Sequence, residues 1–135
     1  MDIQKIFEKC ILCPRKCGVN RLLGYKGACH TSDKLRVSRA ALHMWEEPCI
    51  SGEAGSGAVF FAGCSLRCIY CQNFELARGR KGFEVGIEQL ADIFLALQGK
   101  GAANINLVTP DHFTLAVIPA VRMARERGLM LPVIY

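Results

Sequence analysis

Three cysteines, Cys64, Cys68 and Cys71, stand close together in the spacing C-x3-C-x2-C. Thiolate sulfur is a soft ligand that selects zinc, copper(I) or iron–sulfur clusters. Three thiolates are one short of the four that close a tetrahedral zinc site or a four-iron cluster. A metal centre with an open position is typical of catalysis, a rule stated for zinc that we extend to iron. The spacing therefore favours an iron–sulfur cluster with one iron left open.

Two plainer interpretations of the same three thiols stay open. The cysteines can form a zinc site that takes its fourth ligand from elsewhere in the chain. They can also be unligated thiols in the core, because free cysteine packs as a small hydrophobe. Iron content and a brown colour would separate the cluster from the zinc site.

The cysteines follow an apolar run at residues 58–62, which predicts a buried strand. They then lie on a loop that leaves the C-terminal end of this strand. Proteins of the α/β class place their chemistry at that end, because loops held by a rigid sheet converge on one point.

A second cysteine group, Cys10, Cys13, Cys17 and Cys29, has the spacing C-x2-C-x3-C-x11-C. Proline and glycines interrupt this stretch, so we expect a loop-rich knuckle. Small loops with little core often need a metal to hold them. We treat the four thiols as a candidate second site, for structural zinc or a second iron–sulfur cluster, with unligated thiols as the alternative. Cys49 stands alone and is expected to be a small buried hydrophobe.

Strands and helices alternate after the cysteine loop, which predicts an α/β fold with parallel strands and right-handed crossovers. Alternating apolar residues at 34–42 predict one more strand, at the edge of the sheet. The expected later elements are a helix at 87–98, a strand at 105–108, a helix at about 111–127 capped by Asp111, and a strand at 130–135.

The C-x3-C-x2-C motif resembles the signature of the radical S-adenosylmethionine (SAM) superfamily. Tyr70 stands at the aromatic position before the last cysteine, and Gln72 and Asn73 complete a C-Q-N ending. That ending is similar to the branch of pyruvate formate-lyase activating-enzyme-like proteins. Three more stretches resemble the same branch, so the likeness spans nearly the whole chain; they are residues 13–21, 42–48 and 104–110.

The resemblance implies two cofactors, a [4Fe–4S] cluster and SAM. In the family three cysteines hold three irons, and SAM chelates the fourth. The implied cluster ligands are Cys64, Cys68 and Cys71. Tyr70 would flank the adenine, and Asn106 and Thr109 would meet the amino-acid end of SAM. The family often has G-G-E there, where this chain has V-T-P-D at residues 108–111.

The implied function is that of a radical SAM oxidoreductase. Such an enzyme cleaves SAM reductively to a 5′-deoxyadenosyl radical, which abstracts hydrogen from a substrate. Activation of a glycyl-radical enzyme is one such reaction. The implied partners are a reductant such as flavodoxin or ferredoxin, and a protein substrate of the glycyl-radical type. An iron–sulfur electron carrier and a zinc-binding interaction module without SAM chemistry are the alternatives.

The family's partial (β/α)6 barrel has six strands, of which we expect about three here. The fold that the resemblance implies is an incomplete partial barrel with a Cys-rich extension. Residues 1–52 would form the extension and residues 53–135 the first half of a truncated barrel.

The composition of the chain indicates what kind of protein this is and which partners it lacks. Hydrophobic residues make up 51% of the 135 residues, which is enough for a core. The formal charge of +5 is a mild excess without aromatic interleaving, so we expect no nucleic-acid partner. The sequence has no signal segment and no apolar run long enough for a bilayer. Eight cysteines then indicate a reducing compartment, and we expect a cytoplasmic protein without a membrane partner.

Overall fold

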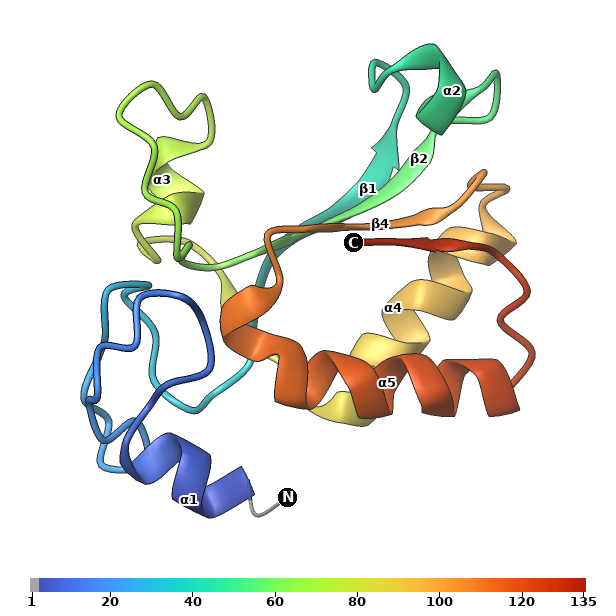
Figure 1. Cartoon of the computed structure of the whole chain (residues 1–135). Helices are drawn as coiled ribbons and strands as arrows, with labels where there is room; N and C mark the ends of the chain where they lie inside the picture. Colours follow the sequence, from blue (N-terminus) through green and yellow to red (C-terminus); the bar gives the residue numbers. More distant parts are fainter. Residues whose placement is uncertain (1–2) are drawn as a thin grey trace.

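A five-stranded mixed sheet in the order β3-β1-β2-β4-β5 organises the chain, whose computed structural model describes residues 3–135 (Figure 1). The predicted α/β class is confirmed. The strands are β1 (Arg36–His43), β2 (Ser56–Phe61), β3 (Phe83–Glu84), β4 (Ile105–Val108) and β5 (Val133–Ile134).

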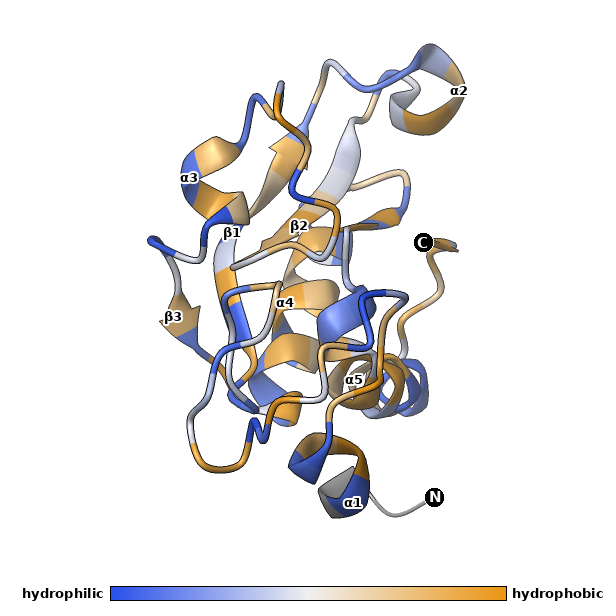
Figure 2. Cartoon of the chain, turned by 60° about the vertical axis from the view of Figure 1, so that its left-hand side comes forward, coloured by the Kyte–Doolittle hydropathy of each residue, from blue (hydrophilic) through white to orange (hydrophobic). Residues whose placement is uncertain are grey.

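Two long helices, α4 (Ile87–Gly99) and α5 (Thr114–Glu126), pack together on one face of the sheet (Figure 1). Hydrophobic residues dominate α4 where it lies against the strands (Figure 2). The core combines apolar side chains from both helices with alternate residues of β2 and β4; among them are Val59, Phe61, Leu90, Phe94, Ile105, Leu107 and Val117. The other elements are α1 (Ile3–Glu8), α2 (Pro48–Ser51), α3 (Phe74–Ala77) and the 3-10 helix η1 (Asp111–Phe113).

The parallel part of the sheet agrees with the alternation of predicted elements. β2 pairs in parallel with β4, and β4 pairs in parallel with β5. Phe60 and Val108 are register partners at the C-terminal ends of β2 and β4. The helix predicted at 87–98 and the strand predicted at 105–108 are confirmed. The last strand is shorter than the predicted 130–135.

The strand predicted at 34–42 is present as β1, beside the parallel strands, but it is not the outermost strand of the sheet. β1 lies inside the sheet, antiparallel to β2 on one side and to the short β3 on the other. Residues 1–52 therefore contribute a strand to the same sheet as residues 53–135. The stretch at 74–84, expected as a plain connection, contains α3 and β3. Local sequence pattern does not reveal which partners a strand finds in space.

Two side chains differ from expectation at the ends of elements. Asp111 does not cap a helix: its carboxylate accepts hydrogen bonds from the hydroxyls of Ser65 and Tyr135. A 3-10 turn precedes α5 instead. Cys49 lies in the short helix α2 and is exposed, not buried.

The second face of the sheet differs from the first. Within residues 3–135, α4 and α5 are the long helices, and both cover the same face. Asn106 and Val108 alternate with the core residues of β4 and are only half-buried, as is Phe60 of β2. We call this the open face. No helix of the described residues is long and apolar enough to cross a membrane.

Candidate metal centre

The cluster loop, residues 63–73, begins where β2 ends. Gly63 opens it with a φ of +81°, a left-handed conformation that favours glycine. A Cβ at Gly63 would collide with the carbonyl oxygen of Cys29 and the methyl group of Thr31. The Gly63 N–H donates to the Leu76 carbonyl oxygen at 2.7 Å. The loop is therefore held between α3 and the N-terminal cysteine region.

The three thiols of the cluster loop are not core residues. Cys68 is exposed, Cys64 and Cys71 are half-buried, and all three are free. This accessibility argues against unligated cysteines packed as small hydrophobes. It suits ligands that must receive iron from solution and leave room for a second molecule.

Two of these thiols, Cys64 and Cys71, line one cavity of about 120 Å³. Its wall includes the C-terminal ends of the neighbouring parallel strands β2 and β4. The other lining residues are Phe60, Phe61, Gly63, Asn73, Leu76, Ala77, Val108 and Thr109. Two of the predicted cluster ligands and the predicted SAM contact Thr109 thus meet at one cavity.

Thr109 holds a strained backbone at the rim of this cavity. Its φ is +52°, which is an outlier for a β-branched residue. Such a conformation costs about 1–3 kcal/mol and is commonly found at ligand clamps. Arg67, in the middle of the cluster loop, also has a positive φ, of 57°. Replacing either residue by glycine would relieve the strain of its positive φ, because glycine has no Cβ.

A second cavity, of about 500 Å³, adjoins the first on the open face. The two cavities share Phe60, Asn73 and Val108. The remaining lining is polar and comes largely from the end of β1 and the residues after it; it consists of Arg39, His43, Trp45, Glu46, Glu47 and Gln72. Trp45 is 89% exposed, so it is not the packing residue that its type suggested.

An imidazole and a carboxylate face each other in this second cavity. The Nδ1 atom of His43 lies 3.3 Å from Oε1 of Glu46. The structure places His43 in the wall of this cavity, which adjoins the cavity lined by Cys64 and Cys71.

Arg15 supports the cluster loop from outside. Its Nε donates to the Ser65 carbonyl oxygen at 2.8 Å, and its Nη2 donates to the Leu66 carbonyl oxygen at 2.9 Å. The hydrogen bonds of its guanidinium are with backbone carbonyls. Nothing local in the sequence identifies a partner fifty positions away.

His112 supports the strand that leads into the loop. It is buried, and its Nε2 lies 3.0 Å from the Ala62 carbonyl oxygen. Burial lowers the pKa of His112 to about 4, against the raising effect of that hydrogen bond, and Arg21 lowers it further. The imidazole is therefore neutral at pH 7, and Nε2 carries the proton because a carbonyl can only accept. Sequence reasoning did not single out this residue.

Positive charges surround the base of the cluster loop. Burial lowers the pKa of His30, and the nearby charges of Arg67, Arg78 and Lys26 lower it further. These cations lie around His30, next to Cys29, whose carbonyl oxygen accepts the hydrogen bond from the Cys64 N–H.

The remaining predicted site residues are not gathered at the two cavities. Tyr70 is 87% exposed and Asn106 is half-buried, and neither lines either cavity. Over residues 3–135, no three His, Cys, Asp or Glu side chains stand together as a ready metal site. The donor set nevertheless fits a thiophilic centre, because two soft ligands face one cavity and the third lies on the same exposed loop. Binding would draw the loop together, as metal sites commonly form with local folding.

The second cysteine group is divided between buried and accessible thiols. Cys10 and Cys29 are buried, Cys13 is half-buried and Cys17 is exposed. Partial burial alone would raise the pKa of the Cys17 thiol. Hydrogen bonds with backbone groups, including those of Val19 and Ala28, and with the Cys10 side chain outweigh this, so the pKa is lowered.

Comparison with known proteins adds one relative. The chain is 32% identical, over 75 residues, to an uncharacterized protein of Methanocaldococcus jannaschii. The matched region is 56% of this chain and 21% of the relative, so the chain spans about a fifth of that protein's length. No family model and no solved structure matches the chain. The similarity links part of the chain to a longer archaeal protein.

Proposed function

We propose that the chain is part of a radical SAM enzyme of the activating-enzyme-like branch. Cys64, Cys68 and Cys71 would hold three irons of a [4Fe–4S] cluster, and SAM would occupy the fourth. One observation carries the proposal: Cys64 and Cys71 line the same cavity as Thr109, at the C-terminal ends of adjacent parallel strands. Loops at those ends are where α/β folds bind cofactors.

The arrangement of the sheet supports the finer fold assignment. Parallel strands β2, β4 and β5, with α4 and α5 on the same face, are what the first half of a (β/α) barrel requires. The open face would then become the barrel interior. On this proposal residues 53–135 are the first half of an incomplete partial barrel, and residues 1–52 are its Cys-rich extension.

The chain's own residues would bind, orient and shield. When bound, the cluster and SAM supply a 5′-deoxyadenosyl radical that abstracts hydrogen from the substrate. Arg67, which lies in the cluster loop itself, would offset part of the charge of the bound thiolates. Phe60 and Val108 give the cavity apolar walls that limit the access of water. Thr109 is the wall residue whose backbone is already strained.

The larger cavity is where we place the substrate. It adjoins the cluster cavity and carries Arg39, Glu46 and Glu47, so it suits a polar substrate group. A glycine segment of a protein partner is the substrate that the resemblance favours. A flavodoxin-like or ferredoxin-like reductant would approach at the exposed side of the cluster loop, where Cys68 lies.

Electron paramagnetic resonance tests this function. The chain is reconstituted anaerobically with iron and sulfide, reduced, and measured with and without SAM. We expect a four-iron signal that shifts when SAM is added. The Cys49→Ala variant is the matched control, because Cys49 is exposed and belongs to neither cysteine group.

Any other result of this resonance experiment supports one of the alternative functions. A four-iron signal that SAM leaves unchanged contradicts the enzyme and supports an electron carrier. Zinc without iron supports an interaction module. In either case the cavity beside Cys64 and Cys71 needs another explanation.

A further inference from the structure

The N-terminal knuckle, residues 10–31, has neither regular secondary structure nor an aliphatic core. It contains no helix or strand, and loops of this length are uncommon unless they are functional or disordered. None of its aliphatic side chains is fully buried. Its buried side chains are Cys10, Arg21, Cys29 and Thr31. Apolar burial therefore stabilises this region very little.

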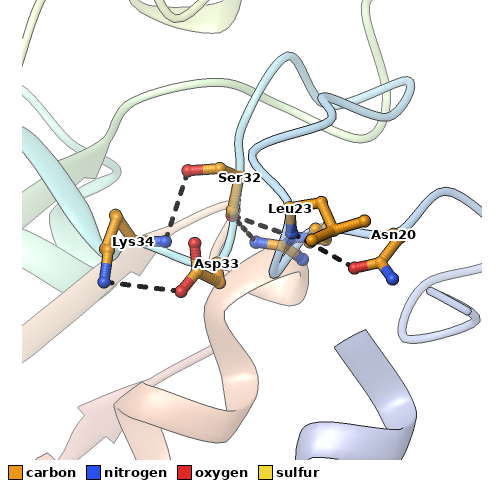
Figure 3. A network of polar contacts seen from close by, with 6 residues as sticks. Asn20, Leu23, Ser32, Asp33 and Lys34 are labelled. Atoms are coloured by element: carbon orange, nitrogen blue, oxygen red, sulfur yellow. Dashed lines mark hydrogen bonds and ion pairs between the residues drawn. The ribbon is translucent and has the colours of Figure 1, made fainter. Parts of the chain in front are cut away.

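Local polar contacts do not replace the missing core. Figure 3 shows two polar contacts, one within the knuckle and one just after it. The Leu23 N–H donates to Oδ1 of Asn20 at 3.2 Å, and the Lys34 N–H donates to Oγ of Ser32 at 3.4 Å. Both hydrogen bonds are exposed to water, so each contributes little.

Arg21 is a buried cation in need of a counter-charge. The residue is 1% exposed, and its guanidinium lies 4.7 Å from the centre of the Phe7 ring. Its donors reach the carbonyl oxygens of Ser32 and His112, which are neutral. Among the described residues its contacts include no carboxylate, and the contact most able to become an anion is the Cys10 thiol, whose Sγ lies 3.8 Å from Nη1. Because an unpaired buried charge is costly, a negative centre beside Arg21 would stabilise this region.

Two of the four thiols, those of Cys10 and Cys29, lie near this arginine. Reciprocal backbone hydrogen bonds, Cys10 N–H to Val19 and Gly18 N–H to Cys10, fold the segment back on itself, at 3.0 and 2.9 Å. Cys17 reaches Gly27, where a Cβ would lie 2.5 Å from its sulfur. Sγ of Cys29 lies 3.1 Å from Oγ1 of Thr31, which Arg21 also contacts, at 3.4 Å.

We propose that the knuckle binds one structural zinc ion through Cys10, Cys13, Cys17 and Cys29. Four thiolates around Zn²⁺ form a closed site with a net negative charge, which supplies the counter-charge that Arg21 lacks. The two buried thiols are held in place, whereas Cys13 and Cys17 lie on an accessible turn that can close on the ion. Closure on binding agrees with the absence of a ready metal site in the described residues.

The zinc site would brace the cluster loop. The Cys29 carbonyl oxygen accepts a hydrogen bond from the Cys64 N–H at 3.2 Å. Arg15, which lies between Cys13 and Cys17, holds two carbonyls of the cluster loop. The proposal does not depend on radical chemistry, because any function of the cluster loop would use the same support.

Metal analysis tests the proposal on the full chain. The chain is produced with zinc in the medium, and zinc and iron are counted per chain. A variant with Cys64, Cys68 and Cys71 all replaced by alanine is measured beside it. We expect one zinc in both proteins, and with cobalt in place of zinc an absorption spectrum of tetrahedral thiolate coordination. Adding Cys17→Ser should weaken zinc binding by more than about tenfold, whereas adding Cys49→Ser should not.

Three results would overturn the proposal. They are a triple variant that binds no zinc, one that takes up iron and sulfide as a cluster at the same thiols, and equal zinc loss in the Cys17→Ser and Cys49→Ser variants. Cys17 is preferred to Cys10 for the test because Cys17 is exposed, whereas Cys10 is buried. The triple variant cannot bind the proposed SAM cluster, so failure of the zinc site and failure of the enzyme proposal are distinguishable.

Discussion

The cluster loop and the N-terminal knuckle carry nearly the same cysteine spacing in opposite order, C-x3-C-x2-C against C-x2-C-x3-C. Their surroundings differ. The cluster loop leaves a rigid parallel strand, its thiols are accessible, and two of them line a cavity. The knuckle has no strand or helix, and two of its thiols are buried beside a buried arginine.

On our two proposals, this difference separates a reactive centre in the cluster loop from a structural one in the knuckle. A reactive metal must be reached by cofactor and substrate, so its ligands stand at a surface on a scaffold that is already folded. A structural metal replaces a core, so its ligands are buried where aliphatic side chains are lacking. Cysteine type and spacing alone do not distinguish the two.

The largest expected effect comes from Cys68→Ala. We expect complete loss of the iron–sulfur signal, because two thiolates cannot hold a four-iron cluster, while zinc content stays unchanged. Iron and zinc counts after reconstitution measure both effects, with Cys49→Ala as control. If one substitution removes both metals, the division into two independent sites is wrong.

Arg21→Met should have the next largest effect. The substitution leaves an apolar side chain beside the Phe7 ring. It removes the hydrogen bonds to the carbonyl oxygens of Ser32 and His112, and the positive charge that would balance the zinc thiolates. We expect the free energy of unfolding to fall by about 3 kcal/mol. Chemical denaturation measures it, and the exposed Arg122→Met is the control, expected to change it by less than about 0.5 kcal/mol. Equal effects of the two substitutions would remove the argument from buried charge.

Acid should destabilise the support beneath the cluster loop. The pKa of His112 is about 4 in the folded chain and about 6.5 when unfolded, so between these values the unfolded state binds more protons. The contribution is fully present above pH 6.5 and is lost as the pH falls to 4, by about 3 kcal/mol.

Denaturation at a series of pH values tests this prediction. His112→Asn should lower stability at pH 7 but flatten its dependence between pH 6.5 and 4. An unchanged slope in the variant would mean that other groups cause the acid sensitivity.

Arg15→Ala should have the smallest effect on stability and the most local one. Arg15 is exposed, so we expect about 1 kcal/mol from its two hydrogen bonds to the loop. Amide hydrogen exchange should become faster in the cluster loop and stay unchanged in α4. The neighbouring Lys16→Ala is the control. Equal exchange in both variants would show that the knuckle does not brace the loop.

The sequence predicted a helix or strand correctly wherever its pattern depends only on the residues of that element. The helix at 87–98 has a 3.6-residue hydrophobic period, and the strands at 58–62 and 105–108 are apolar runs. Both patterns reflect burial directly, and all three elements are present. The position of β1 did not follow, because the pairing of a strand depends on distant partners. β3 was missed because two exposed residues give no periodic signal.

The candidate site could be predicted only in part. Residue type and spacing single out the three cysteines. Thr109, predicted at the end of a recognisable strand, lines the cavity of Cys64 and Cys71, and its contact with SAM stays a prediction. Arg15, His112 and Asn73 were not identified as site residues, since each acts through a partner that is remote in sequence or through a cavity wall. Cys49 was expected to be buried, but lies exposed in a short helix.

By itself the sequence determined which thiols are available as ligands, the α/β class and the strand that leads into the cluster loop. These depend on residue types and on periods of two and 3.6, which are local properties. The tertiary structure decided which thiols are buried, which of them share a cavity, and that Arg21 lies buried beside Cys10. Burial and proximity between distant residues arise only when the sheet, α4, α5 and the knuckle pack together, and packing is a property of the whole chain.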